Sequence, residues 1–375
     1  MARIGINALY LIPGGVGGTE IYLRELLEAL ARIDADNLYF IYTNRDTGSD
    51  LVPRQTNFHW KPQAVRAKFR PARLLWEQTV LPLEAARHRL DVLFNPGFTS
   101  PLLTPCPSVT VFHDLQHKRH PEYFQRLDLP FWRLFLWMSA HRARHLIATS
   151  EATRADLQRF YRIGAKTITV IPHGVGQRFF ALDRSSIEAY LLYVATLHPH
   201  KNHERLLRSY ARRPRRERLV LAGMPGFHAQ SVKALIAELR LGDVVHLTGW
   251  IPREELYELY AHASACVIPS TFEGFGMPVL EALAAGIPTA CSDIPPLRES
   301  AGDAALYFDP FDENAIAAAL DRITEDEQLR RTLTDSGPRQ ARSFTWERTA
   351  RQTLDTLLSA CKGAPVSWTN IVRFH

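Results

Sequence analysis

Residues 268–299 read IPSTFEGFGMPVLEALAAGIPTACSDIPPLRE and contain the clearest local signals of this sequence. The apolar segment Ala265–Ile268 predicts a short strand, and a polar, glycine-containing turn follows it. Strong helix formers then run from Pro278 to Ala285, and Gly286 ends them. A proline just inside a helix start and a glycine just past its end are typical helix boundaries. The stretch therefore predicts a strand, a turn and a helix in direct succession.

The turn offers a place for an anion. The first N–H groups of an α-helix have no partner within the helix, and the helix dipole favours negative charge there. Gly274 and Gly276 lie beside these groups, Glu273 precedes the helix, and Glu281 lies roughly one turn inside it. Two carboxylates around a phosphate-binding helix end suit a ligand that carries hydroxyl groups on both sides of a diphosphate. A nucleotide sugar is such a ligand.

The segment EGFGMPVLEALAAGIP, residues 273–288, resembles the donor-site signature of glycosyltransferase family 4, also described as glycosyl transferases group 1. Members of that family are retaining enzymes of the GT-B fold. The resemblance implies two Rossmann-like parallel-sheet domains that face each other across a cleft, with a C-terminal helix that crosses back to the first domain. A buried strand-to-helix turn with two solvated Glu residues is the plain alternative.

Length and composition fit a soluble globular protein of two domains. A chain of 375 residues is long for one hydrophobic core, and its hydrophobic content of 46% and charged content of 22% are ordinary for a globular protein. The four cysteines lack short paired spacings, which argues against a disulfide framework and a zinc site. No apolar run reaches the roughly 18–20 residues of a membrane span, and the N-terminus lacks a secretory pattern. We expect a cytoplasmic protein.

Strands and helices alternate along almost the whole sequence, which predicts parallel sheets covered by helices. Strands are expected at Arg3–Ala8, Leu38–Thr43, Asp91–Phe94, Val109–Phe112, Leu191–Ala195 and Leu219–Ala222. With the family resemblance, the expected division is an acceptor-binding domain over residues 1–182 and a nucleotide-sugar donor domain over residues 183–344. A crossover helix and tail over residues 345–375 should pack on the first domain.

A glycine loop, GGVGGTE, follows the first expected strand. Its spacing puts Glu20 where a dinucleotide fingerprint would have its third glycine, which argues against a nicotinamide site. In family 4 the corresponding loop lies near the donor phosphate and the acceptor. The resemblance therefore implies an acceptor-side role for Gly14 and Gly15 and donor contacts for Gly17 and Gly18. A plain flexible loop is the alternative.

Another strand, Val109–Phe112, leads into His113 and Asp114, at the sheet edge where open α/β domains bind ligands. Family members carry a His here that contacts the donor sugar or the reacting centre. His113 is therefore an expected catalytic residue that also faces the acceptor, with Asp114 on the acceptor side; a satisfied structural His is the alternative. His117 and His120 follow, but the basic, loop-like segment between them argues against a metal site.

The second expected domain provides a cation for the donor diphosphate. Many family members have an Arg and, five residues later, a Lys; here these positions hold Thr196 and Lys201. Charge builds up on the leaving diphosphate, so Lys201 is expected to be catalytic together with Glu273. Whether His198 or His200 compensates for the missing Arg stays open. The resemblance implies donor contacts from Thr196, Lys201, Gly249, Glu273, Gly274, Phe275, Gly276, Met277 and Glu281.

Two segments allow both a membrane-facing and a buried interpretation. Residues 61–89 are basic with interleaved aromatic residues, which suits an anionic, lipid-bearing surface. A solvated basic loop that runs into a helix with Leu74, Leu75 and Val80 packed inside fits equally well. Residues 124–145 form an aromatic, helix-length stretch, for which a core helix is favoured over an interfacial one.

The expected activity is that of a retaining, metal-independent hexosyltransferase without a cofactor. The NPG, HDL, SEATRADL and HKN elements resemble the bacterial mannosyltransferase-like branch that builds surface polysaccharides. We therefore expect mannose transfer from GDP-mannose to a glycan or polyprenyl-linked acceptor, with peripheral contact to the inner face of an anionic membrane left open. No nucleic-acid-binding module is recognisable.

Several alternatives stay open from the sequence. The donor could be a UDP- or dTDP-sugar, and the same fold hosts nucleotide-sugar epimerases, phosphorylases and non-catalytic sugar-nucleotide binding proteins. Asp34-Ala35-Asp36 has the spacing of a metal-binding Asp-x-Asp motif, but it is expected in a solvated turn. The basic run Arg212–Arg218 is likewise expected to be a solvated loop without a site.

Overall fold

Two compact units make up the protein. The computed structural model describes residues 1–14, 17–124, 128–214 and 217–362. The first unit runs from Met1 to His173 and includes the C-terminal helix from Trp346, and the second runs from Gly174 to Thr345. We expected the boundary after residue 182. Val175 and Phe179 are buried in the hydrophobic core of the second unit, so the segment that precedes that boundary belongs to the second unit.

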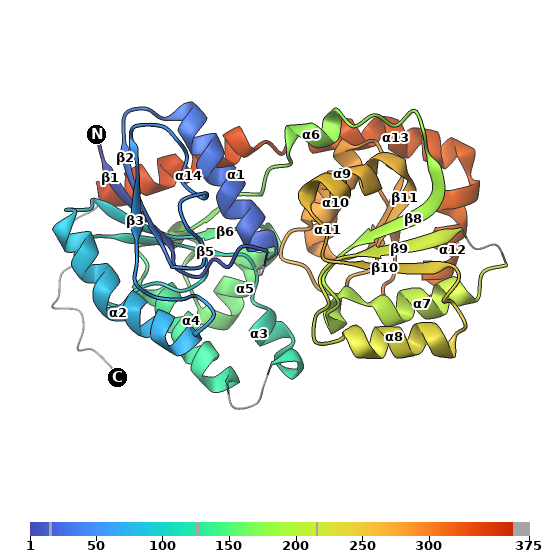
Figure 1. Ribbon diagram of the computed structural model, residues 1–375, viewed down its shortest axis with the longest axis horizontal. Helices are drawn as coiled ribbons and strands as arrows, with labels where there is room; N and C mark the ends of the chain where they lie inside the picture. Colours follow the sequence, from blue (N-terminus) through green and yellow to red (C-terminus); the bar gives the residue numbers. More distant parts are fainter. Residues whose placement is uncertain (15–16, 125–127, 215–216, 363–375) are drawn as a thin grey trace. The chain divides into compact units, whose positions relative to one another are not determined.

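The first unit is built on a seven-stranded parallel sheet of order β3-β2-β1-β4-β5-β6-β7 (Figure 1). Its strands are β1 (Arg3–Ala8), β2 (Leu38–Thr43), β3 (Phe58–Pro62), β4 (Val92–Asn95), β5 (Ser108–Phe112), β6 (His145–Ala148) and β7 (Ile168–Val170). Its helices are α1 (Gly18–Ile33), α2 (Arg70–Arg87), α3 (Gln116–Arg119), η1 (Pro121–Tyr123), α4 (Leu129–Arg142), α5 (Glu151–Tyr161), η2 (Ala165–Thr167) and α14 (Trp346–Cys361). The strand order changes direction between β1 and β4, which makes that pair the topological switch point.

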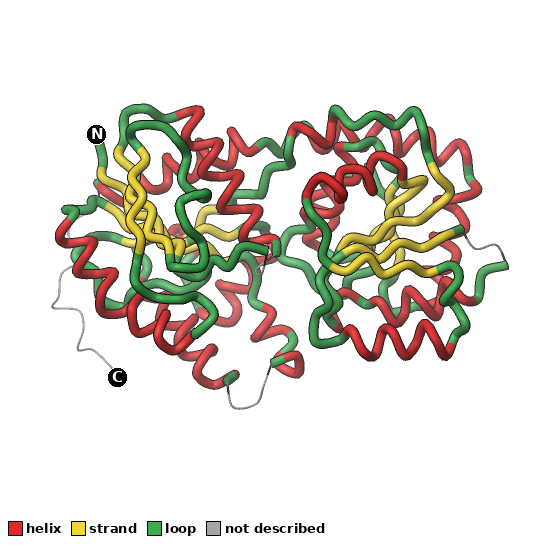
Figure 2. The backbone as a smooth tube through the Cα atoms, in the orientation of Figure 1, coloured by secondary structure: helices red, strands yellow, loops and turns green. Residues whose placement is uncertain are grey.

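The second unit repeats this plan with a six-stranded parallel sheet of order β10-β9-β8-β11-β12-β13. Its strands are β8 (Glu188–Val194), β9 (Arg218–Ala222), β10 (Val245–Gly249), β11 (Ala263–Ile268), β12 (Thr289–Ser292) and β13 (Leu306–Phe308). Its helices are α6 (Gln177–Phe180), η3 (Pro199–Lys201), α7 (His203–Ala211), α8 (Ala229–Glu238), α9 (Arg253–His262), α10 (Met277–Ala284), α11 (Pro295–Ala301), α12 (Glu313–Glu325) and α13 (Glu327–Ala341). Its switch point lies between β8 and β11. Figure 2 shows the strands of each unit enclosed by helices.

The C-terminal helix packs on the first unit, as expected. α14 lies against α1 and against β4, β5 and β6. Arg32 and Glu347 form an ion pair of 2.8 Å between α1 and α14, and the Thr349 hydroxyl donates to the carbonyl oxygen of Pro172 at 2.8 Å. Trp346 is buried at the start of α14 and stacks on the His173 ring. The chain therefore leaves the second unit and completes the core of the first.

Helix α2 corrects one expectation about the segment 61–89. Leu74 is buried as expected, but Leu75 is 65% exposed, so its predicted core position is wrong. The buried stripe of α2 instead contains Arg73 and Glu77 together with Leu81. These positions are three or four residues apart and share one face of a helix. Two charged residues therefore face the interior where an apolar stripe was expected.

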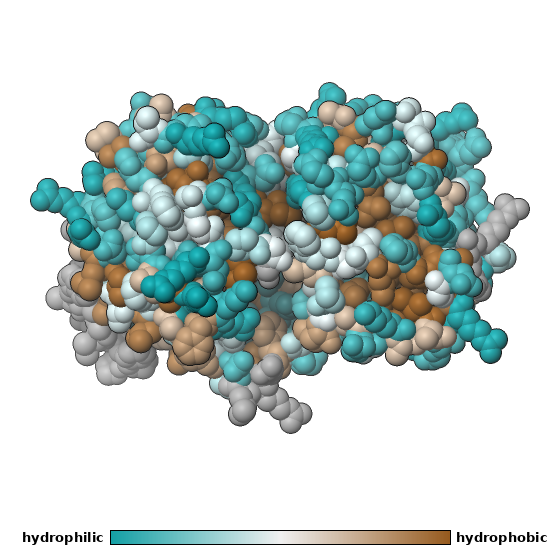
Figure 3. Space-filling model, viewed as in Figure 1, coloured by the Kyte–Doolittle hydropathy of each residue, from teal (hydrophilic) through white to brown (hydrophobic). Residues whose placement is uncertain are grey.

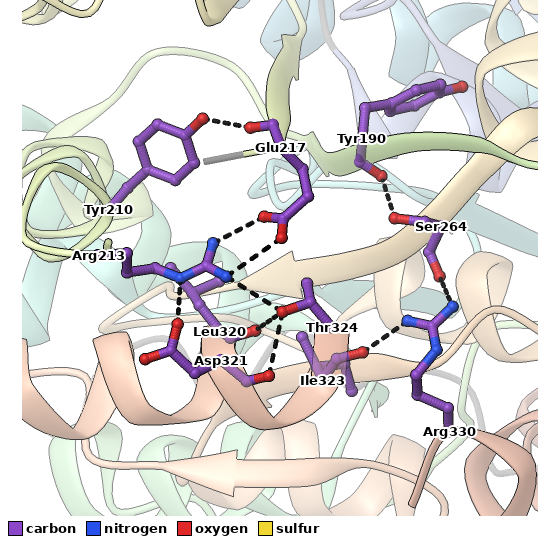
Figure 4. Close-up of polar contacts among 10 residues, drawn as sticks. All are labelled: Tyr190, Tyr210, Arg213, Glu217, Ser264, Leu320, Asp321, Ile323, Thr324 and Arg330. Atoms are coloured by element: carbon purple, nitrogen blue, oxygen red, sulfur yellow. Dashed lines mark hydrogen bonds and ion pairs between the residues drawn. The ribbon is translucent and has the colours of Figure 1, made fainter. Parts of the chain in front are cut away.

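The basic run Arg212–Arg218 is also not simply solvated. The Arg213 side chain has no exposed surface, and its guanidinium donates to Asp321 at 2.6 Å and to Glu217 at 2.9 Å (Figure 4). It donates to the Thr324 hydroxyl at 3.1 Å as well. Arg213 thus ties the segment before β9 to α12. A local composition signal could not distinguish this buried cation from its solvated neighbours.

Asp34 differs from its expected place in the same way. It is buried, and its carboxylate accepts hydrogen bonds from Asn37 Nδ2 at 2.8 Å and from the Tyr39 hydroxyl at 2.5 Å. The pKa of Asp34 is lowered because these hydrogen bonds outweigh the cost of burial. The carboxylate therefore closes the turn after α1.

In the described ranges, no helix is long and apolar enough to cross a membrane.

Candidate donor site

The site begins where β11 passes into α10. Gly276 has a φ of 106°, and a Cβ atom there would lie 2.5 Å from Leu297 Cδ2, so both its backbone and its surroundings require glycine. Helix α10 starts at Met277 with a proline in its first turn, and Gly286 follows its end with a φ of 65°. The helix has no side-chain cap and no acidic residue in its first turn. Its positive end is therefore suited to an anion.

Two loops are hydrogen-bonded together beside this helix start. Asn202, with a φ of 60°, donates from its side-chain amide to the carbonyl oxygen of Pro269 at 2.9 Å. The backbone N–H of Thr271 donates to the carbonyl oxygen of His200 at 2.8 Å. The first loop follows β8 and the second follows β11, which are neighbours in the sheet. The loops therefore meet at the carboxyl edge of the sheet, at its switch point.

Lys201 and Glu273 lie in direct contact at this edge. Lys201 Nζ is 2.7 Å from Glu273 Oε1, and the two side chains are only 17% and 10% exposed. The Tyr193 hydroxyl, at the end of β8, donates to the carbonyl oxygen of Lys201 at 2.8 Å and so holds the lysine backbone in place. The structure thus brings together the two charged residues that the sequence assigned to the diphosphate and to the donor sugar.

Glu281 lies inside α10 and faces α9. It is 6% exposed, the Tyr260 hydroxyl donates to its Oε2 at 3.0 Å, and Arg253 Nη1 lies 3.7 Å from its Oε1. Burial, followed by the nearby Glu281 charge, raises the pKa of Tyr260 well above its usual value. The phenol is therefore a proton donor to this carboxylate. Glu281 is held in one position by two partners from a neighbouring helix.

The other expected donor contacts occupy nearby loops and strand ends of the second unit. Phe275 is buried and packs edge-to-face on Phe344, with ring centroids 5.8 Å apart. Gly249 ends β10 with a φ of 70°. The carbonyl oxygen of Thr196 accepts a hydrogen bond from the His198 N–H at 2.8 Å. Gly274 and Met277 flank Phe275 and Gly276 in the chain.

His198 does not supply the charge of the Arg that Thr196 replaces. Burial, with the positive charge of Lys201 second, lowers the pKa of the His198 imidazole. Its ring lies against Phe227, with centroids 4.6 Å apart, and its Nδ1 has no hydrogen-bond partner in the part of the chain that the structure describes. A neutral ring in this setting is a packing element and adds no cation at neutral pH.

The expected acceptor-side residues lie in the first unit. His113 follows β5 and is buried, and its Nε2 lies 2.8 Å from the Pro96 carbonyl oxygen. Its Nδ1 lies 3.3 Å from His173 Nε2. Burial lowers the pKa of His113 to about 4, so the ring is neutral at pH 7. Both ring nitrogens therefore have partners within the unit. Asp114 Oδ1 accepts from the backbone N–H of Gln116 at 2.9 Å.

The glycine loop leads into α1. Gly14 has a φ of 67°, and its N–H donates to Glu20 Oε2 at 2.7 Å. Gly17 is the N-cap residue of α1, with a φ of 58°, and Gly18 is the first residue of the helix. Glu20 therefore supplies a carboxylate to the first turn of this helix, unlike α10. Gly15 lies outside the described residues.

Comparison with known proteins identifies the family. Residues 177–340 match the family described as Glycosyl transferases group 1, and residues 16–177 match Glycosyltransferase Family 4. Over 263 residues the chain is 31% identical to O-antigen chain mannosyltransferase B of Escherichia coli, a match that covers 66% of this chain and 69% of the relative. This chain belongs to glycosyltransferase family 4.

Two further likenesses agree with this assignment. The glycosyltransferase is 30% identical to the MMP alpha-(1->4)-mannosyltransferase of Mycolicibacterium hassiacum over 65% of this chain, a match that spans 63% of that relative, less than two thirds. A solved sucrose-phosphate synthase structure from Thermosynechococcus elongatus matches with a TM-score of 0.79 at 22% identity, over 96% of this chain and 99% of that one. The fold is therefore GT-B, as the sequence predicted.

Some residues that build this candidate site were not predicted from the sequence. They are the partners that hold the expected residues in place, namely Tyr193, Asn202, Arg253, Tyr260 and Ser270. Asn202 directly follows Lys201, and an Asn at the end of a short loop is a sequence signal that could have marked it, because Asn adopts positive φ more readily than most residues. The tyrosines carry no such signal, because their contacts join segments far apart in the chain.

Proposed function

We propose that this glycosyltransferase transfers mannose from GDP-mannose to a glycan or lipid-linked glycan acceptor in bacterial surface polysaccharide biosynthesis. The observation that carries the proposal is the Lys201–Glu273 pair at the switch point of the second sheet, beside the uncapped start of α10. A cation, a carboxylate and a helix N-terminus in one place suit a sugar attached to a diphosphate. The relatives named above, both mannosyltransferases, support mannose as the sugar.

In the proposed reaction the bond between the anomeric carbon and the diphosphate oxygen breaks. Lys201 and the first-turn N–H groups of α10 stabilise the negative charge that develops on the leaving diphosphate. An acceptor hydroxyl oxygen forms the new bond on the same face of the sugar, and its proton moves to the leaving phosphate. Glu273 binds donor hydroxyls and stabilises the positive charge at the anomeric carbon, while Glu281 binds the ribose. The configuration of the sugar is retained.

We propose that no divalent metal takes part. The charge on the leaving group is matched by Lys201 and the positive end of α10, as set out above. In the described ranges, no group of three or more His, Cys, Asp and Glu side chains is arranged to hold an ion. Transfer measured with EDTA and with added Mg²⁺ or Mn²⁺ should proceed at the same rate. A rate that depends on the added ion would contradict this part of the proposal.

A donor panel tests the proposed sugar. The purified chain is heated with GDP-mannose, UDP-glucose, UDP-galactose and dTDP-rhamnose, and the melting temperature is recorded for each. A ligand at 100 times its Kd stabilises the folded state by about 2.7 kcal/mol, so the true donor should give the largest rise. GDP-mannose is expected to do so. A larger rise with a UDP- or dTDP-sugar would overturn the choice of donor and leave the reaction class unchanged.

Turnover assays with the same nucleotide sugars test the reaction class. Conversion of the donor sugar without any acceptor would indicate an epimerase. Nucleotide binding with no turnover on any glycan or lipid-linked acceptor would indicate a binding protein of the same fold. The anomeric configuration of the product, read by NMR, distinguishes retention from inversion.

We also propose peripheral contact with an anionic membrane through the first unit. Helix α4 exposes Phe131, Leu134 and Trp137 by 52%, 56% and 38%, and α2 exposes Leu75. Arg70, at the start of α2, lies over the Trp132 ring of α4 at 5.9 Å, so the two helices share one surface. Figure 3 shows hydrophobic residues among hydrophilic ones over this part of the unit. Apolar side chains beside exposed cations suit an interfacial surface.

Vesicle sedimentation tests this contact. The protein should bind vesicles that contain phosphatidylglycerol and remain in solution with phosphatidylcholine alone. The double variant Leu134→Gln/Trp137→Gln should lose most of the binding, and its melting temperature should stay near that of the wild type because both positions are exposed. Binding that ignores lipid charge and the two substitutions would contradict the proposal.

A further inference from the structure

The switch point of the first sheet contains a buried polar network that the donor site does not use. Asn7, near the end of β1, donates to Asn95 Oδ1 at the end of β4 at 3.1 Å and to Glu77 Oε2 of α2 at 3.2 Å. The Thr99 hydroxyl donates to the same Glu77 oxygen at 3.0 Å. Glu77 has no exposed surface. Its carboxylate is therefore held by neutral donors at the carboxyl edge of the sheet.

Arg73 lies one helical turn before Glu77, toward the start of α2. It is only 6% exposed, and its Nε has no hydrogen-bond partner among the residues that the structure describes. Glu77 attracts it through space, yet that carboxylate accepts its hydrogen bonds from Asn7, Thr99 and Gln78. Burial lowers the pKa of the guanidinium, since a charge inside a protein loses its water. A buried N–H group without an acceptor is costly, and an anion bound beside Arg73 would supply one.

The start of α2 adds to this positive charge. The helix has no side-chain cap and no acidic residue in its first turn, where Arg70 and Arg73 both lie. Two cations at the positive end of a helix dipole are unfavourable by themselves. A bound anion would offset this repulsion. Arg73 also lies near Tyr10, which follows β1, close enough to act on the pKa of that phenol. The ring of Tyr10 fills the space beside Gly97, where a Cβ atom would lie 2.3 Å from it.

We propose that Arg73, with the first turn of α2, binds a phosphate or diphosphate group of the acceptor. The proposal rests on the proposed function, because it assigns a chemical class to the acceptor of that transfer. The position agrees with the rule that open α/β sheets bind ligands beyond the carboxyl ends of their strands, at the switch point. At the switch point of the second unit, the loop after β8 holds Lys201, the expected cation for the donor diphosphate.

The chemistry of Arg73 favours phosphate over a neutral sugar. Its guanidinium presents donors in a planar fork that matches two phosphate oxygens, and such charge-assisted bonds are the strong ones. The hydroxyl groups of a neutral glycan offer only single, uncharged acceptors, which make weaker hydrogen bonds with a guanidinium. The ligand is therefore an acceptor that ends in a phosphate ester or diphosphate, which a sugar phosphate or a prenyl diphosphate both provide.

Binding of defined phosphates tests the site. Farnesyl diphosphate, inorganic diphosphate, mannose 1-phosphate and farnesol are titrated calorimetrically into the full chain, which is saturated with the nucleoside diphosphate that stabilises it most. Wild type should bind at least one phosphate probe and should not bind farnesol. Arg73→Gln should bind that probe about tenfold more weakly. Arg66→Gln, an equal change of charge at an exposed position of the same segment, should remain within twofold of wild type.

The other results of these titrations also decide whether Arg73 binds phosphate. Equal affinity in wild type and Arg73→Gln overturns the proposal, and so does equal weakening by Arg66→Gln, which would mean general attraction to a basic surface. If Arg73→Gln loses its fold, Arg73→Lys keeps the charge without the fork and should bind about threefold more weakly; unchanged affinity in that variant also overturns it. Nucleotide affinity should be the same in every variant. Absence of nucleotide binding in wild type would instead reject the proposed function.

Discussion

Substitutions of Lys201 and Glu273 can separate their two proposed roles, which are diphosphate binding and charge stabilisation at the reacting carbon. The ion pair of 2.7 Å means that each charge partly neutralises the other. Glu273→Gln should lower the transfer rate about 100-fold or more, because it removes charge stabilisation at the reacting carbon. Its affinity for the nucleoside diphosphate should stay equal or rise, since Lys201 then has no competing carboxylate. Initial rates and calorimetric titration of the same preparation check both statements.

Lys201→Gln should give the opposite pattern. Loss of one charge-assisted contact to a diphosphate costs about 1.5–3 kcal/mol, so nucleotide affinity should fall about tenfold or more. The two variants are matched, because each places a neutral amide at one end of the same ion pair. An equal loss of nucleotide affinity in both would mean that the pair binds the diphosphate as one unit, and the separate roles would be wrong.

At the same scale, His113 shows the limit of prediction from sequence. Its position after β5 could be predicted, because strands of a parallel sheet end at one edge and the sequence pattern marked the strand. Its two partners, Pro96 and His173, are 17 and 60 residues away in the chain. No local pattern specifies such contacts. Lys201 and Glu273 could be named individually, but their mutual contact could not be predicted for the same reason.

Helix α10 depends on the backbone of Gly276. An L-residue in this left-handed region costs about 1–2 kcal/mol, and the added Cβ would also displace Leu297. Gly276→Ala should therefore lower the free energy of unfolding by about 2–3 kcal/mol. Gly249→Ala is the matched control: its φ is also positive at 70°, but nothing lies within 4 Å of the added Cβ. It should cost only about 1 kcal/mol. Urea unfolding measures both, and equal losses would show that packing against Leu297 contributes nothing.

The link between the segment before β9 and α12 depends on Arg213. Removal of one partner from a buried ion pair typically costs about 3–5 kcal/mol, because the remaining charge is left without compensation. Arg213→Ala should destabilise by that amount. Arg212→Ala removes the neighbouring arginine, whose side chain is 55% exposed in its ion pair with Glu313, and should cost less than about 1 kcal/mol. Urea unfolding again provides the measurement. Similar losses in the two variants would mean that Arg213 is solvated in solution.

Elements were predicted well where their own residues determine them. Strands β1 and β2 have the bounds that local patterns give, and most of their residues are apolar. Helix α2 was harder, because its buried face contains Arg73 and Glu77. Their burial depends on Asn7 and Thr99 from other elements. Apolar periodicity identifies the buried face of a helix only when the buried side chains are apolar. The buried face of α2 includes charged side chains, and hydrogen bonds to Glu77 stabilise it.

At the scale of the whole molecule, the two units share one sheet topology but differ in how a cation near the switch point is paired. Each has a parallel sheet whose strand order changes direction once. Each also has a cation near that point, Arg73 of α2 in the first unit and Lys201 of the loop after β8 in the second. Lys201 already has a carboxylate partner at 2.7 Å, whereas Arg73 Nε has none in the described ranges. Glu77 balances the charge of Arg73 through space but accepts no hydrogen bond from its Nε, so this N–H group is left for an acceptor from outside.

Buried histidines in both units give the molecule a defined dependence on pH. Burial lowers the pKa of His113 and His117 to about 4 in the first unit and that of His203 to about 3 in the second. The usual value is 6.5, so between these limits only the unfolded chain binds the proton. The free energy of unfolding is therefore highest above pH 6.5, and it decreases as the pH falls toward the pKa values of the folded state. Each such histidine should cost roughly 1 kcal/mol between pH 7 and pH 5.5.

Between pH 7 and pH 5.5 a change in stability reports on histidines, because carboxylates stay largely ionised above pH 5.5. His203 is the sharpest probe, because it is buried and neither ring nitrogen has a hydrogen-bond partner among the described residues. His203→Leu should therefore raise the stability at pH 5.5 and weaken the pH dependence by close to one proton, since it removes two unpaired polar atoms and one titrating group. His246→Leu, at an exposed position of β10, should leave the slope unchanged. Urea midpoints at pH 7, 6.2 and 5.5 measure this, and a wild-type stability that is flat across the range would show that these histidines are accessible to protons in the folded protein.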